Sequence, residues 1–338
     1  MAKIAINGFG RIGRIFFRQA FEKAGIDIVA INDLGDIENL AYLLSYDSVY
    51  RKYDKEVRVS GNALIVDGKK ITVLQEKDPA NLPWKSLGVD VVIESTGFFE
   101  EFEKAKAHLT AGAKRVIISA PAKDMDGEGG KTILMGVNEK EAKGVALTSN
   151  GSCTTNAASP LIQILHEALG IKKAVLSTTH GYTATQNLVD GPTKGKDFRR
   201  GRAAAENIVP STTGSAISVA RAIPDLEGKF DGIALRVPIP AGSIADITFV
   251  SKKKTTVEEV NKILKDAAKD SRWKGVFTVT EEQVVSSDIL GEPYGAIADL
   301  KFTKVIDGDL VKVLSWYDNE YGYVATLLKH VERVASMI

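Results

Sequence analysis

A glycine-rich turn near the start of the chain constrains the fold more than any other feature of the sequence. It runs from Gly8 to Gly13 in the pattern Gly-x-Gly-x-x-Gly. A short apolar run, Ile4–Ile6, precedes the turn and predicts a β-strand, while apolar residues at helical spacing from Ile12 predict a helix. A second apolar run at 26–31 completes a strand, helix, strand unit. Because such units form parallel strand pairs with a right-handed crossover, this segment predicts a parallel sheet.

The same turn indicates what the first part of the chain binds. Glycines at this spacing let the backbone approach a pyrophosphate, which the N-terminus of the following helix stabilises. Asp33 stands at the end of the second predicted strand, about 20 residues after the last glycine, as in a dinucleotide-binding fingerprint. A carboxylate there bonds the ribose hydroxyls and repels a 2′-phosphate. The sequence therefore predicts a site that prefers NAD to NADP.

Composition excludes several classes of protein. Lys and Arg number 44 against 43 Asp and Glu, a net charge of +1, so we expect no dedicated nucleic-acid partner. No apolar run approaches the ~18 residues that cross a membrane. The first residues do not resemble a signal peptide, so we expect a cytoplasmic protein. One cysteine excludes an internal disulfide and a metal site built on several thiolates, and we expect no metal.

That cysteine, Cys153, lies between a predicted strand and a long predicted helix, Thr154–Leu169. A helix N-terminus favours the thiolate through its dipole and its free N–H groups, which can also hold an oxyanion. We therefore expect a nucleophile that ionises more readily than a free cysteine, with a small buried core thiol as the alternative. His180 ends a predicted strand, where catalytic side chains commonly project. The pairing of Cys153 with His180 is a hypothesis about geometry.

The remaining pattern predicts two domains of different type, since 338 residues suit about two domains. Continuous apolar runs favour buried parallel strands in the first part; they are Val89–Glu94, Arg115–Ser119, Ile133–Gly136 and Val145–Ser149. The second part begins with the long helix and continues with alternating segments: Ala174–Thr179, Gly232–Pro238 and Ala245–Lys252.

We therefore expect an α/β protein in three parts. Residues 1–150 form a Rossmann-type parallel-sheet domain, and residues 151–318 form an α+β catalytic domain with a mixed or antiparallel sheet. Residues 319–338 form a C-terminal helix that returns to the first domain. A basic stretch without periodicity, Thr183–Arg202, predicts a long ordered loop.

Several motifs together resemble those of the phosphorylating glyceraldehyde-3-phosphate dehydrogenase family. They are Asn7–Arg14, Ser152–Asn156, His180–Thr183, Arg202–Ile208, Ser211–Gly214, Arg236–Pro238 and Ser315–Glu320. The resemblance runs from one end of the chain to the other in the same order, and the motif around Cys153 is far more specific than the glycines.

The resemblance implies oxidative phosphorylation of D-glyceraldehyde 3-phosphate to 1,3-bisphosphoglycerate with reduction of NAD, a step of glycolysis and gluconeogenesis. Cys153 would carry the hemithioacetal and thioester, and His180 would act as the base. Thr183 and Arg236 would hold the substrate phosphate. The residues that the resemblance assigns to inorganic phosphate or its surroundings are Ser152, Thr154, Thr213, Gly214 and Arg200, with Arg199 as the alternative to Arg200.

On the cofactor side, the resemblance implies binding by residues of both parts of the chain. They are Gly8, Gly10, Arg11, Ile12, Gly13, Asp33, Lys77, Thr96, Ser119 and Asn319, with Asn319 bonding the nicotinamide carboxamide. Pro192 resembles the branch of the family that uses NAD. The resemblance also implies a homotetramer.

Two other readings remain open from the sequence. One is a related dehydrogenase with the same thioester chemistry, acting on erythrose 4-phosphate or a semialdehyde. The motif residues Thr183, Thr213 and Arg236 favour glyceraldehyde 3-phosphate over these substrates. The other is a dinucleotide-binding protein without catalytic activity, which would leave Cys153 and His180 unexplained.

Overall fold

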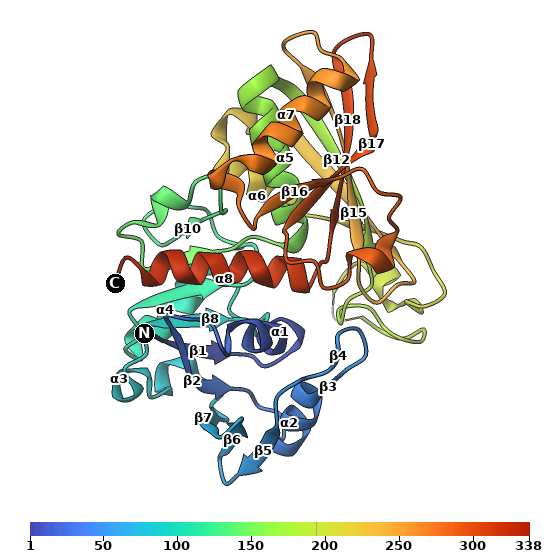
Figure 1. The fold of residues 1–338 in the computed structure, drawn as a ribbon. Coiled ribbons are helices and arrows are strands. Elements are labelled where there is room, and N and C mark those ends of the chain that lie inside the picture. Colours follow the sequence, from blue (N-terminus) through green and yellow to red (C-terminus); the bar gives the residue numbers. More distant parts are fainter. Residues whose placement is uncertain (194) are drawn as a thin grey trace. The chain divides into compact units, whose positions relative to one another are not determined.

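The computed structural model describes residues 1–193 and 195–338, and these form two compact units (Figure 1). Unit 1 consists of Met1–Leu134, Asn138–Gly151 and Leu327–Ile338. Unit 2 consists of Met135–Val137 and Ser152–Thr326. Each unit is built around its own sheet.

Unit 1 contains a nine-stranded sheet in the order β10-β11-β9-β8-β1-β2-β7-β6-β5. The strands are β1 (Ala2–Asn7), β2 (Ile26–Asn32), β5 (Val57–Ser60), β6 (Ala63–Val66), β7 (Lys69–Leu74), β8 (Val91–Glu94), β9 (Arg115–Ile118), β10 (Lys131–Thr132) and β11 (Leu147–Ser149). All neighbouring pairs from β10 to β7 are parallel, which confirms the predicted parallel sheet. The antiparallel extension β5-β6-β7 was not predicted, although β6 (Ala-Leu-Ile-Val) is a short apolar run.

One predicted strand of unit 1 is wrong. The apolar run Ile133–Gly136 does not form a strand; the strand there is β10, which ends at Thr132. The side chain of Asn138 folds back and takes the place of a neighbouring strand: its Oδ1 accepts from the Leu134 N–H at 2.8 Å and its Nδ2 donates to Thr132 O at 2.9 Å. A local side-chain partner has thus replaced the ladder.

Helices complete unit 1. They are α1 (Arg11–Ala20), α2 (Ile37–Ser45), α3 (Trp84–Leu87) and α4 (Phe102–Thr110), together with the residues of α8 (Tyr321–Ala335) from Leu327 onward. A two-stranded ribbon follows α2, formed by β3 (Tyr46–Asp47) and β4 (Arg51–Lys52). The apolar face of α1, including Ile15, Phe16 and Phe17, is fully buried, as its spacing predicted.

Unit 2 contains a seven-stranded mixed sheet in the order β13-β14-β12-β15-β18-β17-β16. The strands are β12 (Ile171–Gly181), β13 (Val209–Thr212), β14 (Phe230–Val237), β15 (Ser243–Ser251), β16 (Phe277–Thr280), β17 (Ala296–Ile306) and β18 (Leu310–Tyr317). The helices are α5 (Cys153–Leu169), α6 (Ser215–Ala222) and α7 (Val257–Lys269). The pairs β12-β14 and β16-β17 are parallel and the others antiparallel, which confirms the predicted mixed sheet.

The predicted long loop and C-terminal helix are both present. Between β12 and β13 the described residues form an irregular segment with one short 3-10 turn, Phe198–Gly201. The helix α8 spans Tyr321–Ala335, within the predicted helical segment 319–338.

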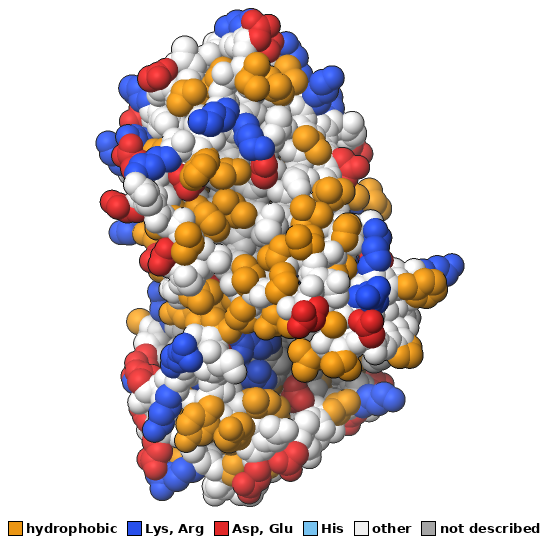
Figure 2. Space-filling view, turned by 90° about the vertical axis from the view of Figure 1, so that its right-hand side faces the viewer, with side chains coloured by type: hydrophobic (Ala, Val, Ile, Leu, Met, Phe, Trp, Pro, Cys, Tyr) orange, Lys and Arg blue, Asp and Glu red, His pale blue; other side chains and the backbone are white. Residues whose placement is uncertain are grey.

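The surface carries both charge signs. On the face shown in Figure 2, basic and acidic side chains are interspersed, in keeping with the net charge of +1. Among the residues that the structure describes, no helix combines the length and the apolar character needed to cross a membrane.

Candidate active site

Cys153 and His180 lie side by side in unit 2. Cys153 is the first residue of α5, and the Cys153 Sγ is 3.3 Å from the Nε2 of His180 near the end of β12. Ser152 caps the helix, because its Oγ accepts from the Thr155 N–H at 3.0 Å. The predicted pairing therefore has hydrogen-bond geometry, which is the requirement for proton transfer between thiol and imidazole.

The other side of the His180 ring faces a carbonyl and a cation. Its Nδ1 lies 2.6 Å from Gly181 O and 2.6 Å from Nη1 of Arg236. Arg236 is opposite His180 in the parallel pairing of β14 with β12, so the register brings the two side chains together. Arg236 can only donate, so a hydrogen bond from its Nη1 needs Nδ1 without a proton, whereas Gly181 O needs a proton on Nδ1; the two contacts are not hydrogen bonds in the same neutral tautomer. The tautomer with its proton on Nδ1 donates to Gly181 O and leaves Nε2 as an acceptor toward the thiol. This tautomer is the one that a base for Cys153 requires.

Burial decides the charges of this pair. Burial raises the pKa of the Cys153 thiol, by more than Arg236, the Thr154 hydroxyl and the helix N–H groups lower it. This direction is opposite to the one that the helix N-terminus alone predicts, although the residue as a whole is only half-buried. Burial and then the Arg236 charge lower the pKa of His180 to about 3. Both shifts favour the neutral forms, a thiol and an imidazole.

Tyr317 lies against the Cys153–His180 pair, and the sequence analysis gave it no role beyond its place in a motif. Its hydroxyl bonds Thr154 Oγ1 at 2.9 Å and Thr178 Oγ1 at 2.7 Å. Its ring meets the His180 ring edge to face, with centroids 5.9 Å apart. The predicted phosphate residue Thr154 is buried and uses its hydroxyl in this contact.

Asn319, predicted to bind the cofactor, is connected to the same part of unit 2. Its Oδ1 accepts from Ser243 Oγ at 2.8 Å, and that oxygen in turn accepts from the Gly181 N–H at 3.2 Å. Because its Oδ1 is held in this way, the amide of Asn319 has a defined orientation with Nδ2 as the remaining donor.

The sequence left Arg200 and Arg199 as alternatives for the phosphate-binding arginine, and their contacts differ. Arg200 donates to Ser211 Oγ at 2.7 Å and to Thr185 Oγ1 at 3.2 Å, and its charge helps to lower the pKa of Arg236. Both arginines face Asp197: Arg199 lies 2.8 Å from its carboxylate and Arg200 lies 3.7 Å from it. The Arg199 side chain is 58% exposed, against 31% for Arg200. The electrostatic coupling places Arg200 and Arg236 in one cationic region.

The predicted hydroxyl residues also come together. Thr183 Oγ1 is 2.9 Å from Thr185 Oγ1, the hydroxyl that Arg200 contacts. Thr213 and Gly214 precede α6, and Gly214 is its N-cap residue. The hydroxyls of Ser152 and Thr213 are both linked to Ser215 Oγ.

A separate pocket lies in unit 1, at the ends of its parallel strands. Its volume is about 400 Å³. Its lining includes Asn7, Gly8, Gly10, Asn32, Asp33, Leu34, Glu76, Lys77, Ser95, Thr96, Phe98 and Phe99. Ends of parallel strands are where nucleotides bind in open α/β sheets.

The glycines shape this pocket as the fingerprint requires. Gly8 has φ +93°, and a Cβ there would come within 2.6 Å of the Ser95 backbone. A Cβ on Gly13 would lie 2.2 Å from Gly8 O, so this glycine permits close packing of helix on turn. Beside Gly10 the space is open, as backbone that a pyrophosphate approaches must be. The residues present therefore fit a dinucleotide.

Asp33 directly follows β2, as predicted. Its Oδ2 accepts from the Phe9 N–H at 2.7 Å and its Oδ1 from the Gly35 N–H at 2.8 Å, which hold the carboxylate at the pocket. Of the predicted cofactor residues in unit 1, the lining contains Gly8, Gly10, Asp33, Lys77 and Thr96. Arg11, Ile12, Gly13 and Ser119 lie outside it.

Arg11, predicted to bind the cofactor, contacts side chains of its own unit. Its guanidinium forms an ion pair with Asp47 and lies over the ring of Tyr50. Ser119 directly follows β9, and its N–H donates to Glu94 O at 2.9 Å.

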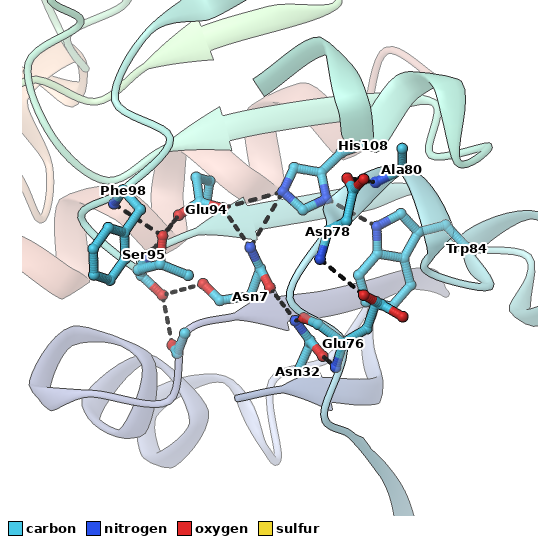
Figure 3. A network of polar contacts seen from close by, with 12 residues as sticks. Asn7, Asn32, Glu76, Asp78, Ala80, Trp84, Glu94, Ser95, Phe98 and His108 are labelled. Carbon is cyan, nitrogen blue, oxygen red and sulfur yellow. Dashed lines mark hydrogen bonds and ion pairs between the residues drawn. The ribbon is translucent and has the colours of Figure 1, made fainter. Parts of the chain in front are cut away.

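A buried polar network that the sequence reasoning missed supports the pocket (Figure 3). Glu94 ends β8; its Oε1 accepts from the Thr96 N–H at 2.8 Å, and its Oε2 lies 2.5 Å from Asn7 Nδ2 and 3.1 Å from His108 Nε2. Trp84 Nε1 donates to His108 Nδ1 at 3.0 Å, so Nε2 carries the proton toward Glu94. Polar residues at the ends of apolar strands were the available signal.

A dinucleotide-type pocket in one unit and a cysteine–histidine pair beside two arginines in the other define the class: oxidoreductases with a nucleotide cofactor and a thiol nucleophile. Comparison with protein families specifies it further. Residues 2–102 match the glyceraldehyde 3-phosphate dehydrogenase NAD binding domain, and residues 152–319 match the C-terminal domain of the same enzyme. The chain belongs to the glyceraldehyde-3-phosphate dehydrogenase family, NAD-dependent oxidoreductases that act on an aldehyde group.

Individual relatives agree over the full length. The chain is 51% identical to the glyceraldehyde-3-phosphate dehydrogenase of Thermotoga maritima, over 100% of both chains. It is 49% identical to that of Geobacillus stearothermophilus, over 99% of this chain and 98% of the relative. It is 47% identical to that of Clostridium pasteurianum, over 100% of this chain and 99% of the relative.

Proposed function

We propose that the protein catalyses the oxidative phosphorylation of D-glyceraldehyde 3-phosphate, with NAD as the hydride acceptor and 1,3-bisphosphoglycerate as the product. The observation that carries the proposal is the 3.3 Å approach of Cys153 Sγ to His180 Nε2 beside Arg236. Membership of the family supports the choice of reaction.

The first step forms a carbon–sulfur bond. His180 takes the thiol proton at Nε2 as the sulfur adds to the aldehyde carbon, and the product is a hemithioacetal on Cys153. The backbone N–H groups at the start of α5 stabilise the developing oxyanion. His180 returns the proton to this oxyanion, which gives the hemithioacetal hydroxyl. It then takes the hydroxyl proton again while hydride leaves the same carbon, and a thioester remains.

Bound NAD supplies the acceptor for that hydride. The carboxylate of Asp33 and the open backbone at Gly10 hold the nucleotide in this proposal, and Asn319 Nδ2 bonds the carboxamide of its nicotinamide. We assign residues 1–150 to nucleotide binding, 151–318 to catalysis, and 319–338 to the C-terminal helix.

Two anions must be bound for the last step, in which phosphate attacks the thioester carbon and the Cys153 thiolate leaves. We assign the substrate phosphate to Thr183 and Arg236, and inorganic phosphate to Ser152, Thr213 and Gly214. We choose Arg200 over Arg199 as the shared cation, because Arg200 contacts the Thr185 and Ser211 hydroxyls and is farther from Asp197, at 3.7 Å against 2.8 Å for Arg199. An anion on Arg236 offsets the charge beside His180, so substrate binding makes His180 a stronger base.

The finer cellular description is also a proposal, resting on the family resemblance. We propose a cytoplasmic homotetramer, which sedimentation of the purified protein tests by its mass.

The decisive experiment follows NADH formation by the purified protein with glyceraldehyde 3-phosphate and NAD, with and without inorganic phosphate. We expect sustained turnover only with phosphate, and a burst of about one NADH per site without it. No turnover in either condition, in protein that still binds NAD, contradicts the proposal and directs the search to erythrose 4-phosphate or a semialdehyde.

A further inference from the structure

Four hydroxyl groups form a continuous chain in unit 2, from the interior of α5 to the start of α6. Thr155 Oγ1 is 2.8 Å from Ser152 Oγ, which is 2.9 Å from Ser215 Oγ. Ser215 Oγ is in turn 2.8 Å from Thr213 Oγ1. Ser152 and Thr213 are two of the hydroxyls that the proposed function assigns to inorganic phosphate, whereas Ser215 has no assigned role.

Backbone donors limit the direction of this chain. The Ser152 N–H donates to Thr155 Oγ1 at 3.1 Å, the Thr155 N–H donates to Ser152 Oγ at 3.0 Å, and the Ser215 N–H donates to Thr213 Oγ1 at 3.2 Å. Each hydroxyl has one proton to donate and two lone pairs to accept with. Three hydrogen bonds between four hydroxyls therefore leave one hydroxyl proton over. It can lie at either end of the chain or on Ser215, but Ser215 is 2% exposed, and a spare proton there would be a buried donor without a partner in the chain.

If the protons run outward, every group is satisfied. Thr155 donates to Ser152, Ser152 to Ser215, and Ser215 to Thr213, and no oxygen accepts more than two bonds. The proton left over is on Thr213, which is only half-buried. It is therefore free for a ligand. Ser152 has then given its only hydroxyl proton to Ser215, so Ser152 serves the phosphate site through this chain and Thr213 is the donor to the anion.

If the protons run inward, one donor is lost. The remaining proton would then be on Thr155, a fully buried residue. Among the residues that the structure describes, the Thr155 hydroxyl contacts only Ser152, whose oxygen would already be donating toward it. An unpaired buried donor is destabilising, so the outward direction is favoured.

We infer that Ser215 is a positioning residue for inorganic phosphate: it fixes the Thr213 hydroxyl as a hydrogen-bond donor directed away from the buried chain. A phosphate anion offers acceptors and needs donors, so this direction matches the ligand. Ser215 is the first residue of α6 and is 2% exposed, so it acts through Ser152 and Thr213. The inference rests on the proposed function and names the device that prepares its phosphate site.

Ser215→Ala removes the connecting hydroxyl and leaves the Thr213 proton free to turn inward. We expect the KM for inorganic phosphate to rise about three- to tenfold, the effect of weakening one hydrogen bond to an anion. Aldehyde binding, NAD binding and the NADH burst come before the phosphate step. The KM for aldehyde, the KM for NAD and the size of the burst without phosphate should therefore not change. Ser215→Thr, which keeps the hydroxyl, should retain the wild-type KM for phosphate.

Ser218→Ala is the matched control. It deletes another buried hydroxyl of α6, one that donates to Gly214 O at 3.2 Å and takes no part in the chain. We expect its KM for phosphate to match the wild type.

Three results overturn the inference. One is a Ser215→Ala enzyme whose KM for phosphate is unchanged, and another is an equal rise in Ser218→Ala. The third is a loss of the phosphate-free burst in Ser215→Ala, which would indicate general damage to the site. Wild-type turnover that does not depend on phosphate removes the proposed function and this inference together, whereas the other results leave the proposed function intact.

Discussion

His330 on α8 provides a quantitative test of how burial controls protonation in unit 1. The residue is 0% exposed, and its Nδ1 lies 3.1 Å from Asn150 Oδ1, an acceptor, so Nδ1 carries the proton. Its Nε2 is buried and has no hydrogen-bond partner among the described residues. Burial lowers the pKa of His330 from 6.5 to about 3.

The sign and size of the effect on stability follow from linkage. A histidine with a lowered pKa stabilises the fold above its unfolded pKa, and this contribution is lost as the pH falls below 6.5 toward 3. Between pH 7 and pH 5 the loss from His330 alone is about 2 kcal/mol, since each pKa unit is worth about 1.4 kcal/mol. His180 has the same direction of shift and contributes a loss of its own.

His330→Leu separates the two histidines. The substitution removes only the titration of His330, so we expect the free energy of unfolding of the variant, relative to wild type, to improve by about 2 kcal/mol from pH 7 to pH 5. Any offset from the lost Asn150 contact is the same at both pH values and cancels. Urea unfolding at constant ionic strength measures the difference. A difference that does not vary with pH refutes the reasoning.

Three further predictions concern the chemistry. Cys153→Ala should abolish NADH formation while NAD still binds, measured by fluorescence titration, because the nucleotide pocket is in unit 1; retained turnover would exclude the thioester. His180→Asn should lower the rate of the phosphate-free NADH burst by about 10²- to 10⁴-fold, the usual contribution of a general base, with little change in the KM for NAD; an unchanged burst would exclude His180 as the base. Asp33→Ala should shift the ratio of kcat/KM for NAD over NADP toward NADP by about tenfold or more, since a carboxylate repels a 2′-phosphate at short range; a variant that gains nothing with NADP contradicts the role assigned to Asp33.

Patterns within short segments predicted much of the fold. The parallel strands β1, β2, β8 and β9 and the helix α5 were evident because burial on both faces demands continuous apolar residues and a helix has its own periodicity. The strand expected at Ile133–Gly136 failed for a local reason, since the Asn138 side chain competes for the same backbone groups.

The candidate site divides in a similar way. The glycine turn and Asp33 could be assigned to a nucleotide site from the sequence, because these residues lie within one strand, helix, strand unit at a characteristic spacing. The contacts of Cys153 with His180 and of Ser152 with Ser215 join residues far apart along the chain, and the sequence offered only the residue types. For the contact of Glu94 with His108, the sequence offered only the position of Glu94 at the end of an apolar strand.

By itself, the sequence determined the kinds of chemistry available: one thiol, a glycine turn followed by an acidic residue, and two contrasting strand patterns. Only the tertiary structure decided how these groups are charged and directed. Burial, which depends on every element packed around a side chain, raises the pKa of Cys153 and lowers that of His180, opposite for the thiol to the effect of the helix N-terminus alone. The direction of the hydroxyl chain likewise depends on which end is buried, because an unpaired donor is tolerated only where a ligand or solvent can reach it.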